Sequence, residues 1–234
     1  MSVRYVTYAT HEQGLFKQLK NNKYGLEIEV LGWGTKWTGF MDKFKAVQRR
    51  IEDLPDDEIV CFLDGFDTLV NADPESVADI FKTKFKGAKI VVSNEMNTGP
   101  IRSYVIKNVF GRCVEEDTGN SGMYIGYVSE LKKALKYALR KDTTDDQRAL
   151  NSVCHLLDIA IDTREKLFHN SPLTPAETHS SAIFVSHPGG SASWEDFFPR
   201  VLRGASEYSK FFVIEIASAL MLIFLIAFVS YQNS

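Results

Sequence analysis

The chain has 234 residues, of which 24% are charged, and its formal net charge is −3 at pH 7. This length is enough for one sizeable α/β domain with its own core. The mild charge balance, without a basic stripe, argues against a nucleic-acid partner. The three cysteines, Cys61, Cys113 and Cys154, are sparse, odd in number and without metal-ligand spacing. We therefore expect neither a disulfide framework nor a zinc site, and we place Cys61 in the core.

Segments typical of strands and helices alternate along the first 190 residues. Alternation of this kind predicts a mostly parallel sheet with helices on both faces. Ligands of such sheets bind beyond the carboxyl ends of the strands. Strands are expected at 3–9, 26–33, 58–64, 88–95, 122–128, 159–162 and 181–187, and helices at 11–22, 41–54, 74–85, 129–141 and 146–158.

Two carboxylates stand at one of these carboxyl ends, in FLDGFDTLV at 62–70. Asp64 and Asp67 converge only if the chain bends after Asp64, and Gly65 permits a bend. Convergent carboxylates repel each other unless a cation lies between them, and hard oxygen ligands suit Mg²⁺ or Mn²⁺. The alternative is a turn in which Asp64 caps backbone groups and Asp67 is solvated. An aspartyl phosphatase, with its D-x-D-x-T motif, is disfavoured by the spacing.

A second strand end carries SHPGG at 186–190. His187 is either a structural histidine or a third ligand of the same metal, and imidazole suits Mn²⁺ better than Mg²⁺. Gly189 and Gly190 let the backbone approach a ligand closely.

Three further segments each allow two interpretations. GNSGMYIG at 119–126 is a tight loop entering a strand, either an ordinary turn or a backbone surface that contacts a sugar or phosphate. In TTDDQRAL at 143–150, Thr144 or Asp145 would cap the next helix, and spacing alone gives neither Asp145 nor Asp146 a catalytic role. Lys43, early in a helix, is either solvated or compensates the charge of a diphosphate.

The C-terminal region contains 19 residues, 211–229, with a single charge at Glu215. At about 1.5 Å per residue, such a helix roughly spans a bilayer core. A buried core helix is the alternative, but it usually has a polar face and this segment has almost none. We therefore predict a domain at 1–190, a stem at 191–210, a transmembrane helix at 211–229 and a short tail at 230–234.

The sequence also predicts on which side of the membrane the domain lies. The N-terminus lacks the apolar stretch of a signal peptide. Arg200, Arg203 and Lys210 precede the apolar segment and no Lys or Arg follows it, and basic residues stay on the cytoplasmic side. We expect a single-pass C-terminal anchor with the domain in the cytoplasm, and the odd cysteine count agrees with a reducing compartment.

Taken together, these segments resemble the glycosyltransferase domain of the procollagen lysyl hydroxylase family over about residues 3–190. VTYATHEQGLFKQL resembles its opening strand and helix, and VLGWGTKWTG its LGxGxxWxGG loop, although Phe40 replaces the last glycine. FLDGFDTLV resembles its DxxD metal motif, with Phe66 as the central aromatic residue. GNSGMYIG, DDQ, LFHN and SHPGG resemble its LNSGGFIG, acidic loop, IFQN and HGNG, although the last lacks the family's asparagine.

The resemblance implies a GT-A fold, which is a Rossmann-like α/β core, together with a UDP-sugar donor and Mn²⁺ (or Mg²⁺). It implies metal ligands at Asp64, Asp67 and His187, and donor contacts at Tyr8, Thr10, Lys43, Phe66, Gly189 and Gly190. It also implies a catalytic region, near the transferred sugar and the acceptor, that contains Asn120, Asp145 and Asp146. Such domains transfer glucose with retention to galactose on hydroxylysine, and related ones occur in large DNA viruses.

The resulting prediction is a metal-dependent hexosyltransferase that moves glucose or galactose from a UDP-sugar to a hydroxyl group of a protein-linked or other glycan. A divalent cation acts as a Lewis acid on the departing diphosphate, and preorganised dipoles with Lys43 do the same in a water-poor cleft. The alternative is a non-catalytic, membrane-tethered module that binds a nucleotide sugar or a partner. The sequence does not identify the acceptor.

Overall fold

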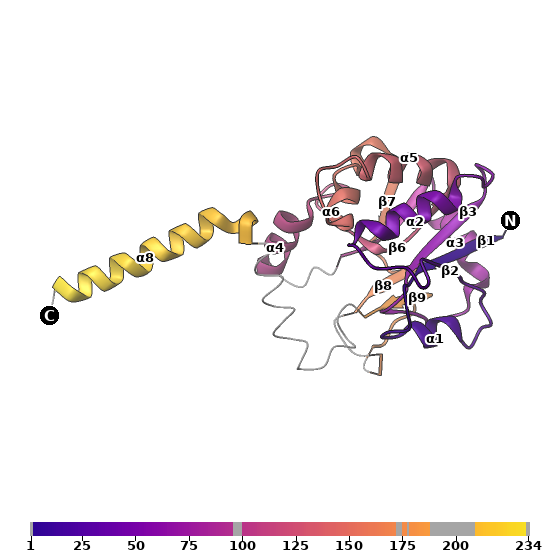
Figure 1. The fold of residues 1–234 in the computed structure, drawn as a ribbon, viewed down its shortest axis with the longest axis horizontal. Helices are drawn as coiled ribbons and strands as arrows, with labels where there is room; N and C mark the ends of the chain where they lie inside the picture. The colour runs from indigo at the N-terminus through magenta and orange to yellow at the C-terminus, as the bar shows by residue number, and fades with distance from the viewer. Residues whose placement is uncertain (1, 96–99, 172–174, 177, 188–208, 233–234) are drawn as a thin grey trace. The chain divides into compact units, whose positions relative to one another are not determined.

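The computed structural model describes residues 2–95, 100–171, 175–176, 178–187 and 209–232. The chain divides into two compact units, Met1–Ser191 and Ala192–Ser234. The first unit contains a six-stranded sheet, a three-stranded sheet and the helices that cover them (Figure 1).

The six-stranded sheet has the order β2-β1-β3-β6-β5-β7. Strand β1 runs parallel to β2 and β3, and β5 runs parallel to β7. Strand β6 is antiparallel to both of its neighbours, β3 and β5. The prediction of a mostly parallel sheet is therefore confirmed with one reversed strand. The strands are β1 Val3–Tyr8, β2 Glu29–Leu31, β3 Ile59–Asp64, β5 Ile90–Asn94, β6 Gly119–Tyr127 and β7 Ile159–Asp162.

The smaller sheet has the order β4-β9-β8, with β9 antiparallel to β4 and parallel to β8. Its first strand begins one residue after Asp67, and its central strand ends one residue before His187. This pairing carries the end of β9 to the turn that follows β3. We did not predict β4 or β8. The strands are β4 Thr68–Val70, β8 Phe168–Asn170 and β9 Phe184–Ser186.

Helices cover both faces of the large sheet, as predicted. One apolar cluster joins the sheet to side chains of α2, α5 and α6, and a second joins its other face to α1, α3 and the smaller sheet. The helices of this unit are α1 Phe16–Lys20, α2 Met41–Ile51, η1 Pro74–Ser76, α3 Val77–Lys84, α4 Pro100–Phe110, α5 Val128–Ala138, α6 Asp146–Asn151 and η2 Cys154–Leu156.

Helix α2 shows how an amphipathic sequence places one charged residue in the interior. Phe44, Val47 and Ile51 follow helical spacing and are at most 1% exposed. The helix start is fixed by Asp42, whose carboxylate accepts hydrogen bonds from the backbone and hydroxyl groups of Thr38. Lys43 lies next to this apolar stripe and is only 7% exposed.

Two predicted elements differ from the structure, and one long helix was not predicted. The helix expected at 11–22 is formed only at α1, five residues long, and α4 was not predicted. The segment GNS, expected as a loop, is the start of β6. Here the pairing of β5 with β6 shifts register between Val92 and Ser93, and this irregularity is not visible in a local residue pattern.

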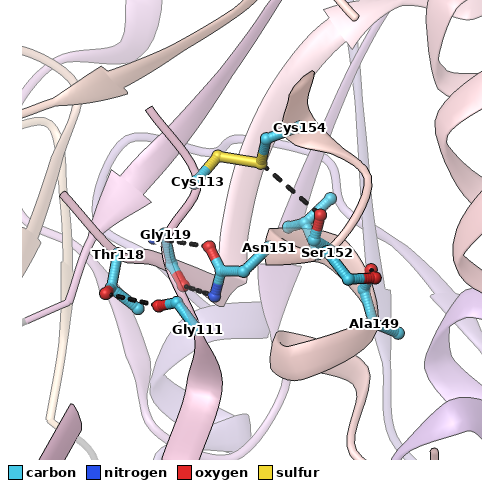
Figure 2. The surroundings of a disulfide bond; sticks show 9 residues. Gly111, Cys113, Thr118, Gly119, Ala149, Asn151, Ser152 and Cys154 are labelled. Atoms are coloured by element: carbon cyan, nitrogen blue, oxygen red, sulfur yellow. Dashed lines mark hydrogen bonds between the residues drawn. A yellow bond between two sulfur atoms is a disulfide. The ribbon is translucent and has the colours of Figure 1, made fainter. Parts of the chain in front are cut away.

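The cysteine prediction was wrong in one respect. Cys113 and Cys154 form a disulfide with their Cα atoms 5.0 Å apart, and it joins the segment after α4 to η2 (Figure 2). Residues 41 positions apart in sequence are thereby linked, and because the pairing is long-range, cysteine spacing alone did not reveal it. Cys61 is free and fully buried, as predicted.

The second unit contains η3 Ser209–Phe212 and α8 Val213–Gln232. Helix α8 carries exposed apolar side chains, among them Ile214 at 79% and Met221 at 72% exposure. Within the described ranges of the chain, no helix combines the length and apolarity needed to cross a membrane. The predicted transmembrane helix at 211–229 therefore gains no support from the structure.

Candidate functional site

The predicted acid pair lies at the carboxyl end of β3. Asp64 is the last residue of that strand, and Asp67 immediately precedes β4. Gly65 between them is required by a close approach, because a Cβ atom there would lie 2.5 Å from the carbonyl oxygen of Tyr8. The chain turns at 65–67, so the predicted bend after Asp64 is confirmed. Gly65 has no positive φ angle, and its lack of a side chain lets this turn pack against the end of β1.

Lys43 connects Asp64 to the start of α6. Its Nζ lies 3.0 Å from Asp64 Oδ2 and 3.0 Å from Asp146 Oδ2. Burial alone lowers the pKa of Lys43, but the charges of Asp146 and Asp64 outweigh it and hold the pKa well above its ordinary value. Lys43 is therefore a permanently charged, buried cation between two carboxylates, and the interpretation as a solvated lysine is wrong.

Asp67 lies beside this centre and depends on β9. Its Oδ1 accepts a hydrogen bond of 3.1 Å from Ser186, and its carbonyl oxygen accepts one of 2.7 Å from the backbone N–H of His187. Burial and the nearby charge of Asp64 raise the pKa of Asp67 to about 7, against a smaller opposing effect of Lys43. The charge of Asp64 therefore acts on Asp67, and Lys43 only partly opposes this effect.

The predicted third metal ligand, His187, is 2% exposed and directly follows β9. Among the residues that the structure describes, no three His, Cys, Asp or Glu side chains are grouped closely enough to hold a metal ion. The metal centre formed by Asp64, Asp67 and His187 therefore stays a prediction. Gly189 and Gly190 lie outside the described residues.

Asp145 and Asp146 have different environments at the start of α6. The side chain of Asp145 caps the helix by accepting a 2.7 Å hydrogen bond from the backbone N–H of Arg148. The Asp146 side chain points into the protein, where it accepts a 2.8 Å hydrogen bond from Ser121 and pairs with Lys43. The capping interpretation is confirmed for Asp145, and Asp146 is the member of the pair that faces the charged centre.

Asn120 belongs to a hydrogen-bonded group that contains an unpredicted acid, Glu95. Glu95 Oε2 accepts a 2.7 Å bond from Asn120 and a 3.0 Å bond from Gln147. Asn120 Oδ1 accepts from the backbone N–H of Gly122, where a Cβ atom would lie 2.9 Å from this oxygen and 3.7 Å from Asp64 Cβ. Glu95 directly follows the apolar strand β5, so the strand-end rule that singled out Asp64 also applies to it.

Aromatic side chains surround the carboxyl end of β1. Tyr8 is 5% exposed, and its ring centroid lies 5.7 Å from that of Trp37, which in turn lies 5.8 Å from Phe40. Gly32 has φ +78°, and a Cβ atom there would lie 2.4 Å from the Tyr8 ring. Trp37 is 39% exposed and Phe40 is 47% exposed, so this loop presents aromatic surface to solvent near the acids. Our prediction had omitted Trp37.

Two more predicted residues lie at the same edge of the sheet. Thr10 Oγ1 lies 2.8 Å from Nδ1 of His11, and the His11 ring stacks 5.5 Å from Phe66 in a tilted arrangement. The backbone of Thr10 accepts a hydrogen bond from Gly34 in the loop that carries Trp37. Tyr8, Thr10 and Phe66 are thus brought to one edge, as a shared ligand site requires.

A cavity of about 830 Å³ lies elsewhere, at the amino end of β1, and its lining includes Arg4, Lys20 and Glu58. Ligands of parallel sheets bind at the carboxyl ends of the strands. The acids, Lys43 and the aromatic loop lie at that other end, and we therefore place the functional site there.

The fold and the charged site define an α/β protein with a ligand site at the carboxyl ends of its parallel strands. A model of the family described as "PLOD GT domain" matches residues 1–180, and the chain belongs to this family, the glycosyltransferase domain of the procollagen lysyl hydroxylases. The resemblance seen in the sequence is confirmed.

Named relatives agree with this assignment. The chain is 28% identical over 187 residues to the "Multifunctional procollagen lysine hydroxylase and glycosyltransferase" of Caenorhabditis elegans, a match that covers 70% of this chain and 25% of that protein. It is 25% identical over 184 residues to "Procollagen-lysine,2-oxoglutarate 5-dioxygenase 1" of Gallus gallus, with the same coverages. The chain thus spans about a quarter of the length of these relatives.

A solved structure is similar in fold. A glycosyltransferase involved in the glycosylation of the major capsid of PBCV-1 superposes with a TM-score of 0.53 and 14% sequence identity, over 82% of this chain and 96% of that one. At this identity the likeness concerns the fold, which is of the GT-A glycosyltransferase type.

Proposed function

We propose that this chain is a metal-dependent glycosyltransferase that moves a hexose, glucose or galactose, from a UDP-sugar to a hydroxyl group of a glycan or glycosylated protein. The observation that carries the proposal is the buried Asp64–Lys43–Asp146 centre at the carboxyl end of β3. In a glycosyltransferase fold, this edge is where a nucleotide sugar binds.

The metal part of the proposal rests on the chemistry of the two acids, since the described geometry does not bring three ligands together. Asp64 and Asp67 offer hard oxygen ligands, and burial, together with the nearby charge of Asp64, raises the pKa of Asp67 to about 7. Asp64, Asp67 and His187 would hold Mn²⁺ or Mg²⁺. When bound, the cation would neutralise charge on a departing diphosphate.

The other residues have separate tasks in this proposal. The aromatic side chains of Tyr8, Trp37 and Phe66 provide flat surfaces for a base and ribose at the end of β1. Lys43 pairs with both Asp64 and Asp146 and so fixes the distance between them. In this proposal Asp64 lies near the diphosphate and Asp146 lies near the transferred sugar. Asn120 and Glu95 supply hydrogen-bonding groups for sugar hydroxyls.

Donor use is tested by incubating the purified chain with individual UDP-hexoses and Mn²⁺, and by measuring released UDP and free sugar. We expect one UDP-hexose to be hydrolysed or transferred, and chelation by EDTA to stop the reaction. The Asp67→Ala variant should lose turnover and Mn²⁺-dependent UDP binding. Asp73→Ala is the matched control, because Asp73 caps η1 and is not part of this site.

Two outcomes would contradict the proposal. Wild-type turnover of Asp67→Ala with Mn²⁺ would remove the metal assignment. Binding of UDP-sugar without any turnover, for all donors and with glycosylated acceptors present, would favour the non-catalytic binding module instead.

Membrane attachment through residues 211–229, with the domain on the cytoplasmic side, is part of the same proposal. Its support is the apolar composition of that segment, the exposed apolar side chains of α8, and the basic residues that precede it. The Cys113–Cys154 disulfide points the other way, because disulfides persist mainly in oxidising compartments. Digestion of the domain by protease added outside sealed membranes would support the cytoplasmic side, and full protection would contradict it.

A further inference from the structure

The Cys113–Cys154 disulfide closes a covalent loop that contains one half of the candidate site. Within this loop lie β6, α5 and α6, and with them Asn120, Ser121, Asp146 and Gln147. Asp64, Asp67 and Lys43 lie outside it. The disulfide loop therefore contains most of the residues that we place near the transferred sugar, and Glu95, which bonds to Asn120 and Gln147, lies outside it.

Asn151 makes a second link at the same place. Its side-chain amide donates a 2.9 Å hydrogen bond to the carbonyl oxygen of Gly119 and accepts a 2.8 Å bond from the N–H of Gly119 (Figure 2). Asn151 is 2% exposed. A side chain at position 119 would meet Val92 at 3.0 Å and Asn151 at 3.2 Å. The last residue of α6 is thus fixed to the first residue of β6, next to Asn120.

The loop before β6 is fastened to the same region. Cys113 N–H donates to the carbonyl oxygen of Asp117 at 2.8 Å, and the Thr118 hydroxyl donates to that of Gly111 at 2.7 Å. The guanidinium of Arg148, in α6, donates to the carbonyl oxygens of Asn108 and Val109 near the end of α4. The disulfide therefore lies among contacts that connect α6 to the end of α4 and to the first residue of β6, and that fasten the loop between these two elements.

Helix α6 needs such contacts because it has only six residues. A helix this short is not stable alone, and its position depends on tertiary links. In its first turn, Asp146 accepts a hydrogen bond from Ser121. Gln147 donates one to Glu95, which also accepts one from Asn120. A small rotation or shift of α6 would separate these pairs.

We propose that the Cys113–Cys154 disulfide and Asn151 form a positioning device that holds Asp146 and Gln147 against the start of β6. Breaking this device lowers the rate of sugar transfer and leaves donor binding largely unchanged, since Asp64 and Tyr8 are held by β1 and β3 and Asp67 is held by the end of β9. The kinetic part of this inference rests on the proposed function, and the structural part does not.

The bond can be opened by an added dithiol. A thiolate of the reagent attacks one sulfur of the disulfide and forms a mixed disulfide, and the other cysteine leaves as a thiolate that takes up a proton. The second thiol of the reagent then closes its own disulfide and releases the second cysteine as a thiol. Cys113 is partly exposed and Cys154 is 3% exposed, so Cys113 is the accessible sulfur.

The test compares the intact chain, the dithiol-treated chain, the double variant Cys113→Ser/Cys154→Ser, and Asn151→Ala with Asn151→Asp. Cys61→Ala is the control, because it removes a cysteine that lies outside the disulfide. Backbone hydrogen exchange is measured at 113–121 and 146–154, and kcat and KM for the UDP-sugar are measured alongside. Circular dichroism restricts the comparison to folded samples.

We expect dithiol treatment to raise exchange in both ranges and to lower kcat by about tenfold or more, with KM within about twofold. The double variant should show the same changes and no response to dithiol, and Cys61→Ala should behave like the wild type. Asn151→Asp keeps the acceptor for the Gly119 N–H. Its backbone hydrogens at 113–121 and 146–154 should therefore exchange more slowly than those of Asn151→Ala.

Unchanged exchange at both ranges in the dithiol-treated chain and in Asn151→Ala would overturn the inference. A fall of kcat accompanied by an equal rise of KM for the UDP-sugar would also overturn the inference. It would mean that the disulfide and Asn151 affect donor binding as much as they affect the position of Asp146 and Gln147. If no donor is turned over, the proposed function fails, and the exchange measurement still decides the structural part.

Discussion

The two halves of the site are built in different ways. Asp64 and Tyr8 end neighbouring parallel strands that pair residue by residue from Val3 with Ile59 to Tyr8 with Asp64, so main-chain hydrogen bonds fix their relative position. Asp146 and Ser121 belong to a short helix and a reversed strand, and a disulfide and side-chain hydrogen bonds hold them. One half is rigid because of backbone pairing, and the other depends on a few individual side chains.

Lys43 joins the two halves. It contacts Asp64 on one side and Asp146 on the other, each at 3.0 Å. Since all three side chains are largely buried, the charge of Lys43 both stabilises the fold and fixes the positions of the two carboxylates. The difference between the halves leads to four predictions, ordered from the largest expected loss of stability to the smallest.

Replacing Lys43 should cause the greatest loss of stability. Lys43→Met leaves two buried carboxylates facing each other, and breaking a buried charge cluster in this way costs about 3–5 kcal/mol. Urea unfolding should show this loss, and turnover should disappear. Lys132→Met is the control, because Lys132 pairs with Asp56 at the surface. Equal unfolding free energies for the two variants would show that Lys43 does not link the halves.

Opening the disulfide should have the next largest effect, and it should be confined to the α6 half. Replacing both cysteines by serine should lower the free energy of unfolding by about 2–4 kcal/mol, because the unfolded chain gains freedom. Thermal unfolding with and without reductant measures this loss. If reductant does not change the melting temperature of the wild type, Cys113 and Cys154 do not contribute through a bond.

A substitution at Gly65 tests the strand-end half. Gly65→Ala places a Cβ atom 2.5 Å from the Tyr8 carbonyl oxygen, and overpacking of this kind costs about 1–3 kcal/mol. We expect donor binding to weaken, because the turn that carries Asp67 must move. Gly87→Asn is the control for backbone strain away from the site, since a Cβ atom there meets open space and only the positive φ angle of Gly87 opposes the substitution. Normal donor affinity in Gly65→Ala would contradict the expectation.

The smallest loss of stability is expected for Asp145→Ala, and a comparison with Asp146→Asn distinguishes the roles of these two neighbouring acids. Asp145→Ala removes a helix cap and should cost about 1 kcal/mol of stability while turnover is kept. Asp146→Asn keeps the size of the side chain but loses the charge that pairs with Lys43, and turnover should fall by orders of magnitude. Chemical denaturation and initial rates distinguish the two. A loss of rate in Asp145→Ala at normal stability would give Asp145 a role beyond capping.

The sequence predicted the strand-end half well, because its signals are local. Apolar runs that end in Asp64 and His187 indicate where a sheet presents its edge, and the same rule applied to β5 would have found Glu95. The α6 half was less predictable. Helix capping identified Asp145, but the pairing of Lys43 with Asp146 and of Cys113 with Cys154 depends on contacts between distant segments. The strand start at Gly119 was missed because its pairing is irregular.

The reversed direction of β6 has a consequence for how members of this fold can diverge. Because β6 runs against β5, the connection from Glu95 to Thr118 leaves and returns at the same edge of the sheet, where Asp64 ends β3. Insertions or deletions in this connection leave every strand pairing of the large sheet in register. This connection carries α4 and Cys113, which lie beside the candidate site. If the proposed function holds, acceptor preference can therefore change through this segment while β1 and β3 keep their pairing.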